Sequence, residues 1–493
     1  MKFLNKIFHL DTRGASLKNE IIGGLVTFIA MCYILPVNAG ILSAMGMDKA
    51  GVFAITAIVS FIVTMIMGIV ANYPIMLSAG MGLNAFLAFT IAGQQGYSWQ
   101  QCMILLTVAG LLFFIFSLTP IRKIIIESIP KDLRCIISAC LGGFILFVGL
   151  KGSGIIVAEA STLVTFGNFA DPGMLLGFIA VILALVLTFT KKKMLSSLAI
   201  PIAILIAAVC GVIISTIMIS NGSITENAGV FTYSTGVDVI DSCAVNLPIA
   251  PWISKPAWGM SGVDKVFFYG FFDQANPYTG SQFGSDLASV FKNPTTYVAI
   301  FSLMFVNLFD TTATLIAVGE KTGVIDENGK MQNYKKAVLA DATGALICAP
   351  LGTSTVTSFA ESNVGVSLGA KTGLAAVVAA LLFLLSAFIY PVFSIFTAGS
   401  VTAAALVSVG VIITVNGVIG INKSDLIACF TAVIAFMFAV LTYSISNGIG
   451  VGLIVYTLSM LIAGRGKEIK LPVYIITALF VVAFALNTVI TLI

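Results

Sequence analysis

The sequence predicts an all-α polytopic membrane protein of about 14 transmembrane segments, arranged as 7+7 inverted repeats. Of its 493 residues, 59% are hydrophobic and only 9% are charged, whereas soluble proteins carry about 25% charged residues. A spanning helix needs about 20 mostly apolar residues, and such blocks follow one another along most of the chain. The net charge of +4 is spread over short loops and forms no basic patch, so no nucleic-acid partner is expected.

The apolar blocks form two groups on either side of a long polar loop. The first group predicts spans near 21–44, 51–72, 75–93, 101–119, 133–150, 173–190 and 197–219. The second group predicts spans near 296–319, 337–351, 353–368, 373–394, 398–417, 425–444 and 446–464, followed by an apolar block at 472–493. Either this last block is an additional helix, or 446–464 is not a separate full span.

Basic residues in the short loops orient the spans, because cytoplasmic loops carry an excess of lysine and arginine. Such residues occur at Lys191–Lys193, Lys335–Lys336 and Arg465 with Lys467. They predict a multi-pass plasma-membrane protein whose N-terminus is cytoplasmic. The predicted units are a cytoplasmic tail (1–20), a first inverted repeat with spans 1–7 (21–219), an external loop (220–295), a second inverted repeat with spans 8–14 (296–464) and a C-terminal apolar segment (465–493).

The third and tenth spans are interrupted and occupy corresponding positions in the two halves. Both MLSAGMGLNAFLAFTIAG (76–93) and LGTSTVTSFAESNVGVSLGAKTG (351–373) are short and rich in glycine, serine and threonine. Matched interrupted spans are the best sequence indication of a midplane binding site in a transporter. Thr353, Thr355 and Thr357 recur with a period of two, which predicts a short extended stretch before a half-helix.

Two carboxylates fall within predicted spans, where an ionisable group costs at least a few kcal/mol and is a functional-site hypothesis by default. Asp310 lies in the middle of its span, and Asn307 precedes it by one helical turn. Glu361 lies at the start of the predicted half-helix, and its two oxygens suit a ligand that presents adjacent N–H donors. For each carboxylate, a structural pairing with a neighbouring helix is the alternative.

Asn84 is the matching polar residue in the third span, and its amide suits the edge of a heterocycle. A helix–helix hydrogen bond is its alternative role. Phe359 flanks Glu361 and could stack on a planar ligand, although aromatic residues are common in spans. The only histidine, His9, lies in the tail, so Asp310 and Glu361 are the natural proton carriers of an ion-coupled transporter.

Other classes of function find less support. No Cys/His cluster with metal-ligand spacing exists, so no metal site or other cofactor is expected. GEKTG (319–323) and GAKTG (369–373) lack the full spacing of a phosphate-binding loop. A membrane-embedded enzyme would need a metal cluster or a nucleophile–base pair, and neither is visible. A sensor without transport activity stays open.

Several segments together resemble the AzgA-like purine permeases, a branch of the nucleobase–cation symporters that transports adenine, guanine and hypoxanthine. They include GGLVTFIAMCYILPVN, SAGMGLNAFLAF, FVNLFDTTATLIAVG and ADATGALICAPLGTSTVTSFAESNVGV, and GTSTVTSF-x-ES is the most specific match. The resemblance implies the fold of the bacterial uracil permease, with a core domain, a gate domain and short strands in spans 3 and 10. It further implies proton symport of a purine base. A homodimer is compatible with the resemblance, which does not fix the oligomeric state.

By position, the resemblance implies that Glu361, Asp310 and Asn84 contact the purine. Asn307 stands where the family usually has an acidic residue, and Asn363 with Val364 replaces the usual small pair after the ES motif. The predicted substrate-binding set is therefore Glu361, Asp310, Asn84, Asn307 and Phe359, with Asp310 and Glu361 also coupling protons. Another nucleobase transporter, or an anion transporter of the same fold, is the alternative; the two carboxylates argue against an anion.

Overall fold

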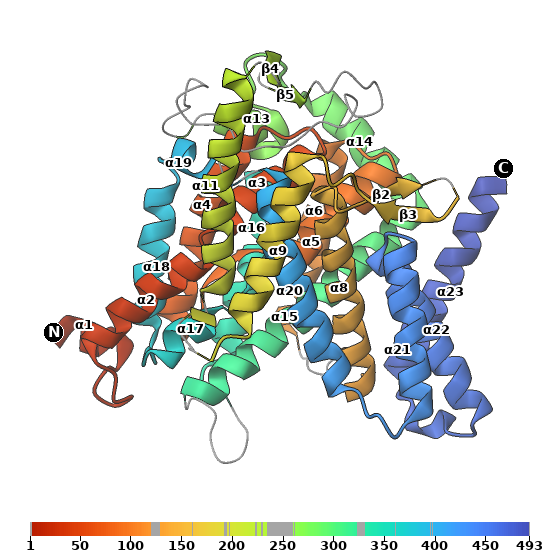
Figure 1. The fold of residues 1–493 in the computed structure, drawn as a ribbon. Coiled ribbons are helices and arrows are strands. Elements are labelled where there is room, and N and C mark those ends of the chain that lie inside the picture. The colour runs from red at the N-terminus through yellow and green to blue at the C-terminus, as the bar shows by residue number, and fades with distance from the viewer. Residues whose placement is uncertain are drawn as a thin grey trace.

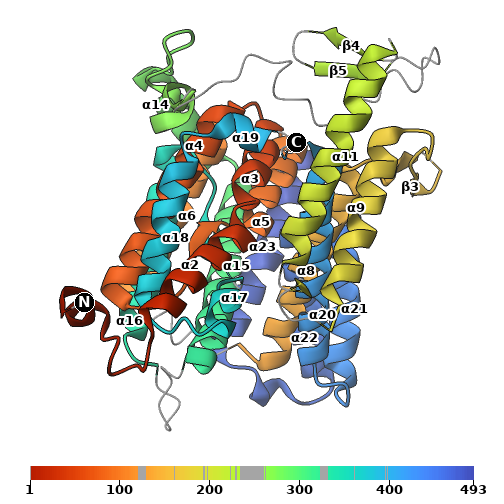
Figure 2. The same ribbon diagram turned by 60° about the vertical axis from the view of Figure 1, so that its left-hand side comes forward.

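The computed structural model forms a single bundle of helices with short strands buried inside it and small hairpins at one end (Figures 1 and 2). Seven helices among the described residues are long and apolar enough to cross a membrane, and five shorter apolar helices accompany them. The predicted helical membrane architecture is confirmed. The structure describes residues 2–119, 129–159, 161–191, 195–196, 198–221, 224–227, 230–233, 260, 262–322, 331–359, 361–394, 396 and 398–492.

The first half follows the predicted spans closely. A break around Tyr33 divides the first span into two helices, and Pro36 falls in the first turn of the second of these, where proline is tolerated. The elements of this half are α1 (Lys2–Phe8), α2 (Leu17–Met31), α3 (Ile34–Ser43), α4 (Lys49–Ile66) with its π-helical continuation η1 (Met67–Ala71), β1 (Leu77–Ala79), α5 (Met81–Ala85), η2 (Phe86–Gln94), α6 (Trp99–Leu118), α8 (Lys131–Gly152), α9 (Pro172–Thr188) and α11 (Ala199–Ser220).

The second half has the same general plan and ends on a further helix. The apolar block predicted at 472–493 is helical and packs beside the last helix of the predicted repeat. The elements of this half are α15 (Pro294–Thr322), α16 (Tyr334–Leu351), β6 (Val356–Ser358), α17 (Ser362–Ser367), α18 (Gly373–Ser386), α19 (Tyr390–Ser394), α20 (Gly399–Gly420), α21 (Leu426–Leu441), α22 (Ile445–Ile462), η4 (Gly466–Glu468) and α23 (Leu471–Leu492).

The strands expected in spans 3 and 10 are confirmed, and they pair with each other. β1 and β6 are antiparallel, with Ser78 opposite Thr357 at the centre of the register. The outer edge of β1 is also satisfied, because the Leu77 amide donates to Thr64 Oγ1 at 2.9 Å. Extended backbone at membrane depth is tolerated only where its polar groups are paired, and here each interrupted span supplies partners for the other.

Close packing of α8 on α20 joins the two halves outside this strand pair (Figure 1). A Cβ atom added at Gly142 would lie 2.4 Å from the Thr414 nitrogen, and one at Gly410 would lie 2.4 Å from the Leu146 nitrogen. Small residues let helix backbones approach in this way inside membranes. The outer faces of the bundle carry large exposed apolar side chains, such as Val186 on α9 and Val433 on α21, as a lipid-facing surface requires.

Two antiparallel hairpins and three short helical elements lie toward the end of the bundle opposite α1 (Figure 1). The hairpin between α8 and α9 was not predicted, since its short strands carry no long alternating pattern. The elements are β2 (Ile156–Glu159) with β3 (Leu163–Phe166), β4 (Ile224–Asn227) with β5 (Val230–Tyr233), α13 (Val263–Val266), the 3₁₀ turn η3 (Phe267–Gly270) and α14 (Gly280–Lys292).

Candidate functional site

A cavity of about 350 Å³ lies beside the β1–β6 pair, within the range of roughly 300–1,000 Å³ that is common for small-molecule sites. One wall comes from the interrupted spans and carries most of the polar groups. The opposite wall is largely apolar and comes from α8, α11 and α20, through Leu141, Ile145, Ile200 and Ile412 among others. A planar ligand could therefore be held by hydrogen bonds on one side and by apolar contact on the other.

Glu361 is the one carboxylate among the residues that line this cavity. It occupies the residue before α17, as expected for the start of the half-helix. Its Oε1 accepts a hydrogen bond from the Tyr33 hydroxyl at 2.9 Å, and no other described side chain donates to this carboxylate. Because α17 has only six residues, its dipole is short, and the fixed tyrosine hydroxyl is the more specific partner of this carboxylate.

Phe359 lines the same cavity, so the structure brings two of the predicted site residues together. The Phe359 amide donates to the Met76 carbonyl at 3.0 Å, which extends the pairing of β6 with the chain before β1. The ring is 6% exposed. Its position is therefore fixed by the backbone of the strand pair, and the side chain offers an apolar surface next to Glu361.

Asn84 is fully buried on α5 and is not part of the cavity lining. Its Nδ2 donates to Asn38 Oδ1 at 2.8 Å, while its own Oδ1 has no hydrogen-bond partner among the described residues. Asn38 in turn donates to Thr56 Oγ1 at 2.9 Å and to Thr353 Oγ1 at 3.0 Å, and it accepts from Ser354 at 2.9 Å. This asparagine–hydroxyl network ties α3, α4 and α5 to the chain that leads into β6.

Asn307 is buried on α15, also outside the cavity lining, and its Oδ1 has no partner among the described residues. The same helix contains position 310, but the side chain of Asp310 lies outside the described part of the structure, so its predicted role stays a prediction. A third carboxylate, Asp341 on α16, is fully buried and accepts from Thr311 at 2.8 Å and from Ser358 at 3.1 Å. Those bonds connect α15 and α16 to β6.

The chain is similar to known transporters over nearly its whole length. A sequence model described as the permease family matches residues 18–446. The chain belongs to this permease family. The guanine/hypoxanthine permease PbuG of Bacillus subtilis is 35% identical to it over 494 residues, covering 98% of this chain and 99% of that protein. The adenine permease AdeQ of Escherichia coli is 34% identical over 477 residues, covering 97% and 95% of the two chains.

Solved structures of other transporters have the same fold as this permease. The transmembrane domain of the cyanobacterial bicarbonate transporter BicA superposes with a TM-score of 0.54 at 13% identity, covering 87% of this chain and 97% of that domain. Murine Slc26a9, in its inward-facing state, gives a TM-score of 0.58 at 10% identity over 91% of this chain and 69% of its own. The permease is therefore a multi-pass membrane protein of this transporter fold.

Sequence reasoning missed three polar residues that organise the permease. Tyr33 lies at the break of the first span and Asn38 lies within α3, and a buried tyrosine hydroxyl or asparagine amide needs a partner. Glu20 is fully buried at the start of α2. It accepts from the backbone nitrogens of Lys371 (2.7 Å), Thr372 (3.1 Å) and Ala375 (3.2 Å), so it caps the start of α18. Its place directly before a long apolar run was the available signal.

Within the described part of the permease, no group of three histidine, cysteine or acidic side chains is arranged to hold a metal ion. The cavity beside β1 and β6 therefore offers hydrogen bonds, one carboxylate and apolar surface as its means of recognition.

Proposed function

We propose that the protein is a secondary active transporter that imports purine nucleobases by proton symport. The relatives PbuG and AdeQ are named for guanine/hypoxanthine and for adenine, so adenine, guanine and hypoxanthine are the candidate substrates. One observation carries the proposal. Glu361 lines a cavity of suitable size, with one oxygen fixed by Tyr33 and the other available to a ligand.

The chemistry of the cavity fits a neutral heterocycle with N–H donors. A carboxylate oxygen accepts hydrogen bonds from ring N–H groups, and bonds to a charged acceptor are about twice as strong as neutral ones. Phe359 supplies an aromatic face for a planar ring. Asn84 and Asn307 each carry a buried Oδ1 without a partner among the described residues, but neither lines this cavity, so the proposed recognition rests on Glu361 and Phe359.

Transport would follow from motion of one part of the bundle against the other around this cavity. The cavity lies between the interrupted spans, which carry Glu361, and the apolar wall from α8, α11 and α20. The interrupted spans would form part of the core domain, and that wall would form part of the gate domain. Protons would be carried by Glu361, by Asp310 or by both. The protein would lie in the plasma membrane with its N-terminus in the cytoplasm.

Uptake of labelled hypoxanthine into proteoliposomes tests the proposal. With an inward proton gradient, we expect accumulation that unlabelled adenine or guanine reduces and that uracil leaves largely unchanged. A sodium gradient without a proton gradient should not drive accumulation. Failure to take up any purine would overturn the substrate class, whereas accumulation driven by sodium alone would overturn proton coupling only.

An anion substrate, as named for BicA, fits the cavity less well. Its described lining contains Glu361 and neither lysine nor arginine, so a bound anion would meet a carboxylate without a compensating cation. Uptake of labelled bicarbonate in the same proteoliposomes provides the direct control.

A further inference from the structure

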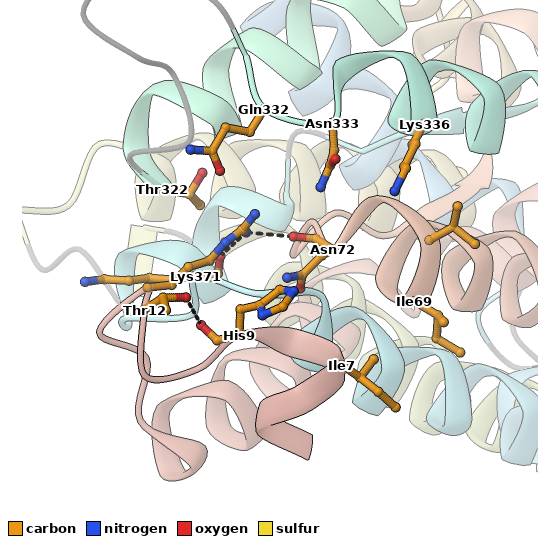
Figure 3. Close-up of a pocket in the computed structure, with 12 residues that line it drawn as sticks. Ile7, His9, Thr12, Ile69, Asn72, Thr322, Gln332, Asn333, Lys336 and Lys371 are labelled. Atoms are coloured by element: carbon orange, nitrogen blue, oxygen red, sulfur yellow. Dashed lines mark hydrogen bonds between the residues drawn. The ribbon is translucent and has the colours of Figure 1, made fainter. Parts of the chain in front are cut away.

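A second, larger cavity of about 600 Å³ lies at the end of the bundle that carries the N-terminus. Figure 3 shows its walls, which come from the N-terminal segment, from η1 and Asn72, from the start of α16 and from the connection between α17 and α18. This site is separate from the cavity of Glu361, and the two cavities share no lining residue.

The lining of this cavity is cationic. Arg13, Lys336 and Lys371 all contribute to it, and none of the described lining residues is aspartate or glutamate. In Figure 3, Lys336 extends from α16 toward the cavity, whereas the side chain of Lys371 lies at the other end of the lining and extends away from Lys336. Burial lowers the pKa of Arg13 from its usual value, but an arginine remains protonated in proteins. The described part of the lining therefore contains three basic residues and no acidic one.

Contacts within the protein use the arginine but not the two lysine amines. Arg13 Nη1 donates to the Asn72 carbonyl at 2.8 Å and to the Lys371 carbonyl at 3.2 Å, which holds the N-terminal segment against the bundle. Among the described residues, neither Lys336 nor Lys371 forms an ion pair or a side-chain hydrogen bond. The buried carboxylate of Glu20 accepts hydrogen bonds from the backbone nitrogens of Lys371, Thr372 and Ala375.

Neutral donors complete the wall between the lysines. Gln332 and Asn333 directly precede α16 and line the cavity, and Asn333 points toward Asn72 and His9 (Figure 3). One N–H of Asn333 Nδ2 donates to the Ala71 carbonyl at 3.3 Å, which leaves its second N–H for a ligand. Amide N–H groups and ammonium groups are the donors that suit phosphate oxygens. A volume of about 600 Å³ is larger than a single inorganic ion requires and suits a phosphate with an organic group attached.

We propose that this cavity is a binding site for a phosphate-bearing anion, held by Lys336, Lys371 and the neighbouring amide donors. The ligand is either a soluble phosphorylated metabolite or the phosphate headgroup of an anionic lipid. Its occupant would bridge the N-terminal segment, α16 and the connection that follows α17, the half-helix that begins beside Glu361.

Ribose 5-phosphate is a suitable soluble probe, because it carries a phosphate but no purine that could enter the Glu361 cavity. We expect it to bind the purified full-length protein in calorimetry, and ribose, its matched control, not to bind. The double variant Lys336→Gln/Lys371→Gln should raise the Kd of ribose 5-phosphate by about a hundredfold, at roughly tenfold for each charged hydrogen bond lost. The control variant Lys423→Gln/Lys467→Gln removes two exposed lysines elsewhere and should leave the Kd unchanged.

The lipid arm measures the melting temperature in nanodiscs of phosphatidylcholine with or without phosphatidylglycerol. If phosphatidylglycerol raises the melting temperature of the wild type and of the control variant but not of the Lys336/Lys371 variant, the site binds a lipid headgroup. If only ribose 5-phosphate binds, the site takes a soluble ligand. Absence of both effects, or equal effects in the two double variants, would overturn the proposal.

Discussion

The two interrupted spans have the same backbone arrangement, a short strand followed by a short helix, but the side chains around it differ in chemistry. Each contributes one strand to the β1–β6 pair and continues into a short helix. In the first half, Asn84 is fully buried and bonded to Asn38 within a network of neutral side chains. In the second half, Glu361 borders a cavity, and the Tyr33 hydroxyl is the side chain among the described residues that donates to it.

Under the proposed function, this difference separates a span that supports the strand pair from a span that binds the ligand. A network of amides and hydroxyls in which nearly every group is paired rigidifies the elements that it joins. A carboxylate with a free oxygen is costly at membrane depth unless a ligand or proton compensates it. The interrupted span of the first half would therefore hold the strand pair in place. The interrupted span of the second half would use the strand pair to position the Glu361 carboxylate beside the cavity.

The largest effect is expected for Glu361→Gln. The change keeps the size of the side chain but removes the charge, and each hydrogen bond to a charged group contributes about 1.5–3 kcal/mol. Hypoxanthine uptake by proteoliposomes should fall by roughly a hundredfold or more, while the yield of inserted protein stays normal. Uptake close to that of the wild type would remove Glu361 from the site.

Asn38→Leu should destabilise the fold more than any other single change in the network of neutral side chains around Asn84. It removes four hydrogen bonds to Thr56, Asn84, Thr353 and Ser354, and a buried group left unpaired costs about 1–3 kcal/mol. We expect a clear fall in the melting temperature of the detergent-purified protein, with the purine KM of the surviving fraction nearly unchanged. A variant with normal stability and a lost purine affinity would reverse the assigned roles.

Tyr33→Phe should give an intermediate effect on transport. It removes the hydroxyl that donates to Glu361 Oε1 and leaves the ring in place, so uptake should fall by about tenfold. Tyr269→Phe is the matched control, because that hydroxyl pairs with Thr107 Oγ1 at 2.7 Å outside the cavity lining. If both variants lose the same activity, the Tyr33 hydroxyl has no specific role.

Asn84→Ala is expected to have the smallest effect. Asn38 keeps its bonds to Thr56, Thr353 and Ser354, and one neutral hydrogen bond contributes about 0.5–1.5 kcal/mol. The KM for hypoxanthine should therefore rise by less than about tenfold. If transport were impaired as strongly as by Glu361→Gln, the two interrupted spans would contribute equally to recognition of the base.

Much of the fold could be predicted because hydrocarbon surroundings leave few alternatives for the backbone. The span predicted at 133–150 forms a helix over Lys131–Gly152, and the one at 398–417 forms a helix over Gly399–Gly420. The period of two in Thr353, Thr355 and Thr357 likewise predicted the extended stretch that contains β6, whereas β1 was implied by the family resemblance. The hairpin of β2 and β3 was missed, since four-residue strands give no periodic pattern that stands out from a loop.

The site was predicted less completely, because its partners are far apart in sequence. Glu361 was visible as a carboxylate in an apolar block, but the Tyr33 hydroxyl that holds it comes from 328 residues earlier. Glu20 was assigned to a polar tail, although it is buried against the start of α18. Charge at membrane depth is apparent from sequence, whereas the identity of the group that compensates it depends on the fold.

Calorimetric binding of hypoxanthine to the purified protein tests the central claim most directly, since binding does not depend on the coupling ion gradient. The claim is that the interrupted span with Glu361 recognises the base and that the interrupted span with Asn84 supports the strand pair. We expect Glu361→Gln to weaken binding by roughly a hundredfold or more and Asn84→Ala by less than about tenfold. Unchanged binding by Glu361→Gln, or equal losses in the two variants, would contradict the account.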